Sequence, residues 1–387
     1  MARRAAAGTG TIRKKTLNRG NKQYTYWEAR ATIGYDPGTG KQIQRTFTGK
    51  TQKEVAQKLK AATAAIDEGT YTAPSKMTIS QWLDIWVAEY LGGVKPATVA
   101  SYKTIVNTHL KPGLGATKLD TLNAHTIQGF YNSLEASPKT VKNVHGVLHK
   151  AMQQAVNNGY IRFNPTDACV LPRVEKKEIQ PLDETQITAF LKAIHGHKFE
   201  NLYIVTLFTG LREGEALGLL WDCVDLEKGT LQINKQLQLS RSTGGEYVLV
   251  PTKNSKGRSI TLAPFVITTL RKERRQQLEN KMRYGECWAN SGFVFTDELG
   301  RHLKHSTVYK NFKAITTDMG LPDARFHDLR HSYAVASIKS GDDIKTVQEN
   351  LGHATASFTL DVYGHVTEQM KKDSAARMEQ FIRAVNG

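Results

Sequence analysis

The chain has 387 residues, with 53 Lys or Arg against 36 Asp or Glu, so its formal net charge is +17. This length exceeds what one hydrophobic core usually organises, and the charge favours a polyanionic partner, with nucleic acid ahead of an anionic membrane. No apolar run approaches a membrane span, no secretory signal opens the chain, and three isolated cysteines indicate neither a disulfide framework nor a paired-cysteine zinc site. The sequence therefore predicts a soluble, cytoplasmic protein of two or three domains with no membrane partner.

The N-terminal fifth of the chain is a basic module. Residues 1–76 hold 15 Lys or Arg and 5 Asp or Glu. Alternating side chains at 24–33 and 42–48, on either side of a turn that contains Pro and Gly, predict two hairpin strands. Helical spacing over 51–67 predicts one helix behind them. We expect a small β-sheet plus helix domain over residues 1–70, whose basic ribbon either enters a DNA major groove or is the solvated face of a small adaptor.

A helical module follows the basic one. Residues 71–77 show no periodicity and contain Pro74 and Ser75, which predicts a linker. From residue 78 the helical period takes over, and the all-α module extends to residue 172. Its apolar stripes predict four helices, at 79–86, 98–110, 122–134 and 140–157.

A third domain is expected over residues 178–387. A helical period restarts after the N-cap residue Asp183, a few strands follow, and helices return until the end of the chain. The predicted strands are 230–239, 247–251 and 258–262. The predicted fold class is therefore multidomain: a small sheet plus helix, an all-α module, and a mainly α domain with a small antiparallel sheet.

Four separated segments of the third domain hold side chains suited to a phosphate. The first presents Arg212 on a glycine-bearing turn, with Glu215 one helical turn later. The second, residues 252–258, concentrates three cations, including Lys253 and Lys256, in a turn between two predicted strands. Taken singly, such an arginine is usually a surface or ion-pair residue, and a basic turn is usually solvated.

The other two segments lie further along the chain. His327 and Arg330 stand at i and i+3 and so share one helical face. His327 and His331 at i and i+4 also allow a zinc pair, although the sequence offers neither the glutamate of a metalloprotease helix nor an obvious third ligand. The last segment places Tyr363 ten positions after His353. A tyrosine there packs in a core or on a surface by default, and the chain has 14 tyrosines.

The order of these segments, Arg-Glu, turn Lys, His-x-x-Arg, Gly-His and then Tyr, closely resembles the tyrosine recombinase family, which includes phage and conjugative-transposon integrases. The resemblance covers nearly the whole chain. The third domain looks like the family's catalytic domain, the helical module like its core-binding domain, and the basic module like its arm-binding domain. The resemblance implies a site-specific recombinase of a mobile element or prophage that cleaves and rejoins DNA through a 3′-phosphotyrosine intermediate.

The resemblance also implies partners and an assembly. The partners are double-stranded DNA with core-type and arm-type sites, and accessory DNA-bending or directionality factors. Family members work as homotetramers on two paired sites and use no metal or other cofactor. In the C-terminal tail an apolar stripe suits docking either on a neighbouring subunit or on the chain's own domain. The stripe consists of Met378, Phe381, Ile382 and Val385.

Physical chemistry agrees with the site residues that the resemblance implies. Attack of an oxygen on a phosphodiester builds up negative charge, so two bidentate donors aimed at the non-bridging oxygens are expected. A tyrosine nucleophile needs a base, and the departing 5′ oxygen needs an acid. The implied roles are a clamp of Arg212 and Arg330, a further hydrogen bond from His353, Glu215 as the residue that holds the geometry, Tyr363 as nucleophile, His327 as base, and Lys253 as general acid with Lys256 as its rival.

Two other functions compete with an integrase. A type IB topoisomerase shares the tyrosine chemistry but relaxes supercoils in place, and a DNA-binding regulator would carry a decayed site. Two DNA-binding modules ahead of the catalytic domain favour the integrase over the topoisomerase. All the key positions of the family are filled in this sequence, which argues against a decayed site.

Overall fold

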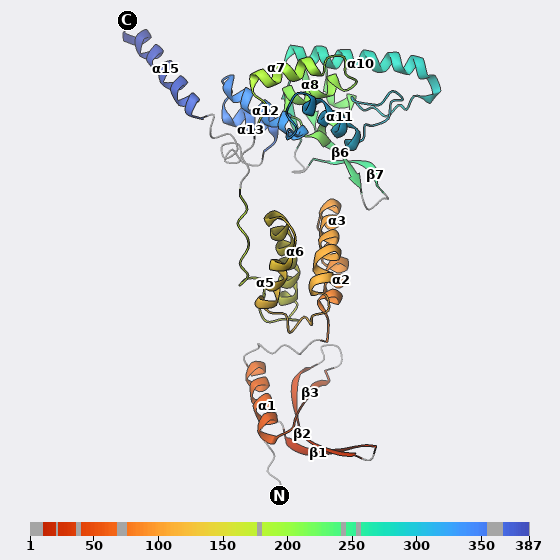
Figure 1. The fold of residues 1–387 in the computed structure, drawn as a ribbon, viewed down its shortest axis with the longest axis vertical. Coiled ribbons are helices and arrows are strands. Elements are labelled where there is room, and N and C mark those ends of the chain that lie inside the picture. Colours follow the sequence, from red (N-terminus) through yellow and green to blue (C-terminus); the bar gives the residue numbers. More distant parts are fainter. Residues whose placement is uncertain are drawn as a thin grey trace. The chain divides into compact units, whose positions relative to one another are not determined.

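The computed structural model divides into two compact units, Met1–Glu175 and Lys176–Gly387. Their ribbons are drawn in Figure 1. No helix in the described part of the chain has both the length and the apolarity needed to cross a membrane. The structure describes residues 11–20, 22–35, 40–67, 76–175, 180–240, 245–252, 257–353 and 367–386.

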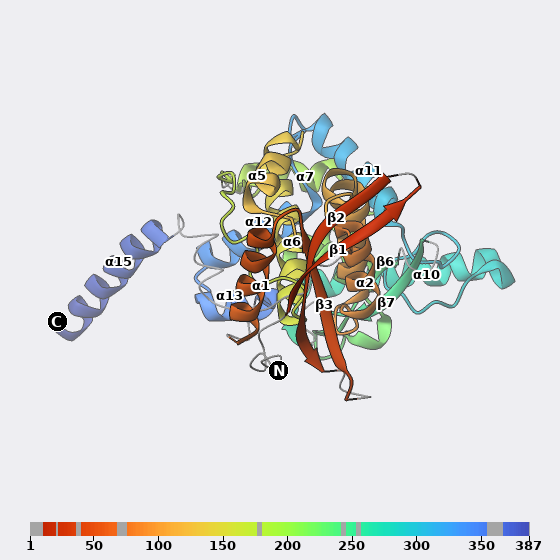
Figure 2. The same cartoon turned by 90° about the horizontal axis from the view of Figure 1, so that it is seen from below.

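The N-terminal part of the first unit is a three-stranded antiparallel sheet with one helix against it (Figure 2). Strands β1 (Ile12–Arg19), β2 (Lys22–Tyr35) and β3 (Gln42–Gly49) lie in that order, and α1 (Gln52–Asp67) packs on β2. The two predicted strands and the helix are present, and β1 is an additional strand. Its sequence is mostly basic and polar, so it lacks the apolar alternation that marks a strand, and pairing with β2 defines it. The small core consists of Ala29, Ala31, Val55 and Leu59.

The rest of the first unit is helical, as predicted. Side chains of Thr78, Asn123 and Ser137 cap three of its helices by accepting from backbone N–H groups. The indole of Trp82 donates to the carbonyl of Ala151 at 2.9 Å inside the shared core. The predicted helix 98–110 is part of a longer helical run with a π-helical turn. The elements are α2 (Ile79–Glu89), α3 (Pro96–Ile105), η1 (Val106–Leu110), α4 (Lys111–Leu114), α5 (Ala124–Ser133) and α6 (Pro138–Asn157).

The second unit is mainly helical. Asp183 caps its first helix, as predicted, in a capping box with Gln186. Aromatic rings of Phe190, Tyr203 and Phe312 meet at centroid distances of 5.8–5.9 Å in the centre of its core. The helices are α7 (Glu184–Ala193), α8 (Glu200–Thr209), α9 (Glu213–Leu217), η2 (Trp221–Cys223), α10 (Pro264–Tyr284), η4 (Gly285–Cys287), α11 (His305–Asp318), α12 (Phe326–Lys339), α13 (Ile344–Leu351) and α15 (Thr367–Asn386).

The described residues of the second unit form two small sheets, which corrects the prediction of one. Strands β4 (Val224–Asp225), β5 (Thr230–Ile233) and β8 (Arg258–Thr261) form one sheet, and β6 (Lys235–Ser240) and β7 (Glu246–Pro251) form the other. The single strand predicted at 230–239 is therefore wrong. The alternation of side chains continues through Asn234, but the strand before this residue pairs with β8 and the strand after it pairs with β7.

The same topology shows that the strands on either side of the turn predicted at residues 252–258 do not pair with each other. Residues 253–256 of this turn lie outside the described residues. Strand β7, which ends before this segment, pairs with β6, whereas β8, which begins at its end, pairs with β5. The segment therefore connects two different sheets. Its start is fixed by Thr252, which is buried and whose backbone N–H donates to the carbonyl of Asn234 at 3.3 Å.

Candidate active site

Arg212 lies in the turn between α8 and α9. Gly210 ends α8 at a φ of 65°. A Cβ at this glycine would lie 2.5 Å from the ring of Tyr333 and 2.7 Å from Leu351, so the turn requires glycine. The backbone N–H of Arg212 donates to Glu215 Oε2 at 2.9 Å, and its Nη1 donates to Oε1 at 2.8 Å. Glu215 therefore fixes one edge of the Arg212 guanidinium. The side chain still reaches solvent, because 26% of it remains exposed.

Glu215 is the buried anion of this site, with 1% of its side chain exposed. Arg258, the first residue of β8, donates to Oε1 at 3.0 Å and to Oε2 at 2.6 Å. Burial by itself would raise the pKa of Glu215, but the hydrogen bonds and charges of Arg258 and Arg212 outweigh it and lower the pKa to about 2. Glu215 is therefore ionised at neutral pH and holds two guanidinium groups.

Arg330 is almost completely buried on α12, with 1% of its surface exposed. Its Nη1 donates to the carbonyl of Gly210 at 2.7 Å, and its Nη2 donates to the carbonyl of Leu351 at 2.6 Å. A buried guanidinium is costly unless its N–H groups find acceptors. Arg330 therefore joins the α8–α9 turn to the end of α13.

The C-terminal end of α13 gathers three arginines. The carbonyls of residues 350–352 each accept from a different guanidinium, from Arg258 at 2.7 Å, Arg330 at 2.6 Å and Arg212 at 3.3 Å. The last carbonyls of a helix lack intrahelical partners and carry partial negative charge, which favours cations there. Gly352 turns the chain away at a φ of 63°. The result is a concentration of positive charge at one point of the second unit.

Three histidines of this cluster are neutral at neutral pH. Burial, followed by the charges of Arg330 and Arg212, lowers the pKa of His353 to about 3. The same causes in the same order lower the pKa of His327. Burial, followed by His327, lowers the pKa of His331 to about 4, and the two rings lie 4.9 Å apart. A neutral imidazole has one N–H donor and one acceptor nitrogen, so each ring can donate a hydrogen bond or accept a proton.

The structure brings five of the expected site residues together and does not describe the others. Lys253, Lys256 and Tyr363 lie outside the described residues. Described residues flank them in the sequence: Arg258 follows the two lysines, and His353 precedes the tyrosine. Across the described ranges, no group of three or more His, Cys, Asp or Glu side chains is placed to hold a metal ion. The five expected residues that lie together are Arg212, Glu215, His327, Arg330 and His353, and Arg258 and His331 complete this cluster.

Comparison with known proteins decides the family. The model of the phage integrase family matches residues 180–370, and that of the phage integrase N-terminal SAM-like domain matches residues 78–135. Over 378 residues the chain is 31% identical to a "Tyrosine recombinase XerC-like" protein of Caldanaerobacter subterraneus subsp. tengcongensis, which covers 92% of this chain and 96% of that protein. The chain belongs to the tyrosine recombinase family. The recombinase is also 25% identical over 369 residues to the ICEBs1 integrase of Bacillus subtilis, with 94% of this chain and 98% of that protein covered.

Solved structures share the fold of the recombinase. The Tn1549 transposon integrase in complex with transposon right end DNA matches with a TM-score of 0.68 and 22% identity, over 78% of this chain and 100% of that one. A lambda integrase tetramer bound to a Holliday junction matches with a TM-score of 0.57 and 19% identity, over 94% and 97%. The family resemblance inferred from the sequence is thus confirmed, and the recombinase is a DNA strand-transferring enzyme of the integrase type.

Arg258 also belongs to the cluster, although the site residues expected from the sequence did not include it. It is one of the three cations of the turn predicted at 252–258, for which a solvated position is the usual case, whereas only 10% of its side chain is exposed. The alternation of β8 carries the missed signal. Arg258 and Ile260 point to one side of β8, and Leu262, directly after the strand, continues the alternation. Ile260 and Leu262 are buried in the core. An arginine in phase with two core residues faces inward.

Glu213, next to Arg212, is a second, half-buried carboxylate that the sequence did not reveal. Its Oε2 lies 2.8 Å from Nε2 of His305, and 16% of its side chain is exposed. Within the described part of the chain its Oε1 is buried without a hydrogen-bond partner. Burial raises the pKa of Glu213 to about 7 and lowers the pKa of His305. The pair therefore joins the start of α9 to the start of α11 in a protonation-dependent contact.

This contact predicts a pH dependence of stability. The folded pKa of Glu213, about 7, lies above the ordinary value of 4.5, so its contribution to stability is fully present below about pH 4.5 and is lost as pH rises through about 7. Glu213→Gln has nothing to titrate there. Relative to wild type, this variant should gain stability between pH 5 and pH 7.5, by up to about 3 kcal/mol. Chemical unfolding of both proteins across this range measures the difference, and parallel pH profiles would contradict the assignment.

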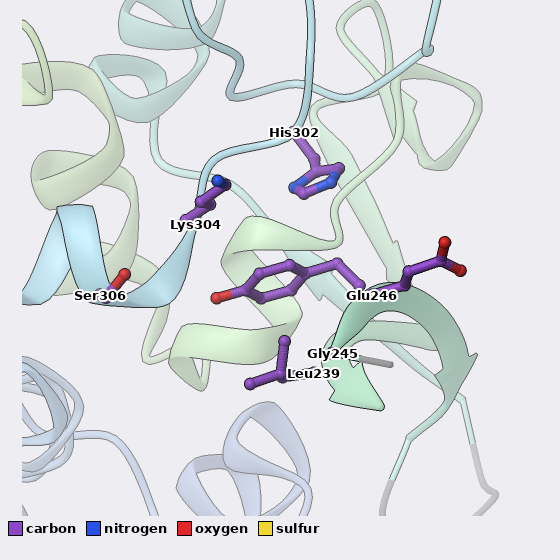
Figure 3. Close-up of a pocket in the computed structure, with 7 residues that line it drawn as sticks. Leu239, Gly245, Glu246, His302, Lys304 and Ser306 are labelled. Atoms are coloured by element: carbon purple, nitrogen blue, oxygen red, sulfur yellow. The ribbon is translucent and has the colours of Figure 1, made fainter. Parts of the chain in front are cut away.

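An open pocket of about 560 Å³ lies where β6 and β7 meet the segment before α11 (Figure 3). Leu239 and Tyr247 contribute from the strands, and His302 and Lys304 from that segment. The rings of Tyr247 and His302 lie 5.0 Å apart, and the Tyr247 hydroxyl accepts from the backbone N–H of His305 at 3.1 Å. Neither Arg258 nor any of the five site residues brought together above lines this pocket. The Tyr247 hydrogen bond joins β7 to the first residue of α11.

Proposed function

We propose that Arg212 and Arg330 bind the non-bridging oxygens of the DNA phosphate that is cleaved. The observation that carries this proposal is that both guanidiniums bond to one end of α13, at the carbonyls of Gly352 and Leu351. Arginine forks bind phosphate oxygens bidentately, and fixed donors stabilise the charge that develops when an oxygen attacks. In this proposal Glu215 holds Arg212 in place through its two hydrogen bonds.

Tyr363 is the nucleophile in this proposal. A tyrosine hydroxyl has a pKa near 10, so losing its proton at neutral pH costs about 4 kcal/mol. His327 accepts that proton. Burial, Arg330 and Arg212 lower the pKa of His327, so its ring is unprotonated before the reaction and can act as a base. The positive charge of the arginines lowers the cost of the phenolate. His353, which is also neutral, donates a further hydrogen bond to the phosphate.

Lys253 protonates the leaving group, with Lys256 as its rival. The phenolate oxygen of Tyr363 bonds to phosphorus, the bond from phosphorus to the deoxyribose 5′ oxygen breaks, and the lysine proton goes to that oxygen. The products are a 3′-phosphotyrosine and a 5′ hydroxyl. Because the phosphotyrosine conserves the energy of the phosphodiester, a 5′ hydroxyl of a second strand reverses the step and joins new DNA ends without nucleotide hydrolysis.

The domains ahead of the catalytic domain supply DNA contacts. We assign residues 1–70 to arm-type sites and 78–172 to core-type sites, joined by the linker 71–77 and followed by the catalytic domain 178–387. Support comes from the net positive charge of the N-terminal fifth and from the similarity to integrases solved on DNA, among them the Tn1549 transposon integrase. Accessory DNA-bending or directionality factors are further partners that we propose.

The sheet of the first domain has a charged face suited to DNA. Ala29 and Ala31 of β2 point into the core with α1, so Glu28 and Arg30 point to the opposite face. Around Glu28, Arg13 lies at 2.9 Å, Lys15 at 3.0 Å and Arg30 at 3.4 Å. One carboxylate thus organises three cations into a single array. In our proposal this array contacts the DNA backbone.

The tail helix α15 provides the contact between subunits. Among the described residues, the side chains of its apolar stripe are exposed to solvent. An exposed apolar stripe on a helix suits a groove of a partner, and the similarity to a lambda integrase that forms a tetramer on a Holliday junction makes a second copy of this chain the proposed occupant. The stripe consists of Met378, Phe381, Ile382 and Val385.

Recombination between two sites tests the proposed function. The purified recombinase is incubated with two plasmids that carry its footprinted element ends and insertion site, and the DNA next to the sites is sequenced. We expect exchange of the flanking DNA in the absence of ATP. Supercoil relaxation without exchange would identify a topoisomerase-like enzyme instead, and site binding without either reaction would identify a regulator.

A further inference from the structure

We propose that Arg258 is a positioning residue for strand transfer, which holds Arg212 and the end of α13 in the geometry that receives the phosphate. This inference rests on the proposed phosphate clamp of Arg212 and Arg330. Arg258 does not belong to that clamp, because its guanidinium faces Glu215 and the backbone of Asn350. It acts through these two partners.

The fork of Arg258 joins two elements of the site. Nη1 and Nη2 bond to the two oxygens of Glu215 on α9, and Nε bonds to the carbonyl of Asn350 on α13 at 2.7 Å. Three N–H groups of one rigid plane thus fix the distance between α9 and α13. A lysine ammonium is a point charge on a flexible chain and cannot reproduce this planar arrangement.

The charge of Arg258 keeps Arg212 available for an anion. Glu215 is buried, ionised and bonded to both arginines. Without Arg258 the carboxylate would keep Arg212 as its single cationic partner among these contacts, and the stronger pull would compete with a phosphate for the same guanidinium. Arg258 therefore balances Glu215 so that the more exposed Arg212 can also bind substrate.

Packing places Arg258 against the turn that supports the clamp. A Cβ added at Gly352 would lie 3.1 Å from both Cδ and Nη1 of Arg258. The side chain therefore lies directly on Gly352, whose carbonyl accepts from Arg212. The next residue along the chain is His353. Loss of the Arg258 side chain would remove a support of this turn and shift the arginine and histidine that depend on it.

The experiment measures single-turnover cleavage of footprinted site DNA at saturating full-length protein. Arg258→Met should lose roughly 10- to 100-fold in rate, the size expected when a reacting group is misplaced by about an ångström. Arg258→Lys should lie between Met and wild type. Arg301→Met is the matched control, because Arg301 also pairs with a carboxylate, Asp297, but outside the cluster. It should cleave at the wild-type rate. Thermal unfolding checks that each variant folds, and the Lys variant keeps the charge beside Glu215 if the Met variant does not fold.

A second substrate separates the two routes by which Arg258 could affect the rate. Arg258 begins β8, so it also borders the segment of the proposed acid Lys253. A 5′-bridging sulfur leaves as a thiolate, since thiols have a pKa near 8.5, and needs no acid. If Arg258 acts through Arg212 and α13, the Arg258→Met defect persists on this substrate. Restoration by sulfur would overturn the proposal, because the residue would then serve only the acid.

A double variant tests the route through Glu215. Glu215→Gln combined with Arg258→Met should cleave no more slowly than the slower single variant, because both changes release the same guanidinium. Multiplied defects, a wild-type rate in folded Arg258→Met, or full activity of Arg258→Lys would each overturn the inference. Arg212→Lys separates this failure from that of the proposed function. If it cleaves normally, the clamp itself is wrong, whereas normal cleavage by Arg258→Met alone refutes only the positioning role.

Discussion

Arg212→Lys and Arg330→Ala are expected to reduce strand cleavage by about 10³-fold while site binding stays close to wild type. Each substitution removes a planar donor aimed at the charge that develops on the phosphate, and the loss of one such donor typically costs 10²- to 10³-fold in rate. Lysine retains the charge at position 212 but not the bidentate geometry, so charge alone should not rescue cleavage. Binding depends on many other cations of this basic chain and should change little.

Single-turnover cleavage and a binding titration on the same DNA measure the two effects. Arg330 is buried, so its alanine variant also leaves the carbonyls of Gly210 and Leu351 without this donor. Arg330→Lys is the matched variant that keeps a cation in the same space. It should fold better than the alanine variant and still cleave poorly. Loss of DNA binding in both arginine variants would show that these residues anchor the DNA or the fold and do not act in the reaction.

Glu215→Ala should destabilise the catalytic unit by about 3–5 kcal/mol, the cost of removing one partner from a buried ion pair. The substitution would leave the guanidiniums of Arg258 and Arg212 without their carboxylate in a buried place. Since the pKa of Glu215 is lowered to about 2 against burial, the folded state favours the anion, and its stabilising contribution is lost only as pH falls from about 4.5 through about 2.

Chemical unfolding near pH 7 measures this loss. Glu227→Ala is the matched control, because Glu227 also pairs with an arginine, Arg271, but is 92% exposed at 3.7 Å. Exposed pairs of this kind contribute roughly 0–1 kcal/mol. Glu215→Gln should lose less stability than Glu215→Ala because it keeps the shape and one acceptor. If Glu215→Ala unfolds like the control, the carboxylate is not the structural centre of the cluster.

The sequence predicted those parts of the site that follow from local spacing. His327 and Arg330 share a helical face because they are three positions apart, and the structure places both in one cluster on α12. Arg212 and Glu215 meet across one helical turn for the same reason. The helices of the middle module followed from apolar stripes, because that period depends only on neighbours along the chain.

The parts that sequence analysis missed depend on contacts between distant segments. The carbonyls of residues 350–352 could not be expected to collect three arginines, since backbone acceptors leave no mark in the sequence. The change of sheet at Asn234 is invisible because the alternation continues across it. Glu213 is half-buried where it contacts His305 of α11, whereas an acid beside an arginine in the sequence suggests a surface pair. Tertiary packing decides each of these cases.

Mapping the covalent protein–DNA bond identifies the residue that attacks the phosphate. The recombinase is incubated with a nicked copy of its footprinted site that cannot be religated, the adduct is digested, and the modified peptide is identified by mass spectrometry. We predict a 3′-phosphodeoxynucleotide on Tyr363 and no adduct with Tyr363→Phe. A nucleotide on another residue, or an adduct that persists in Tyr363→Phe, would contradict the account.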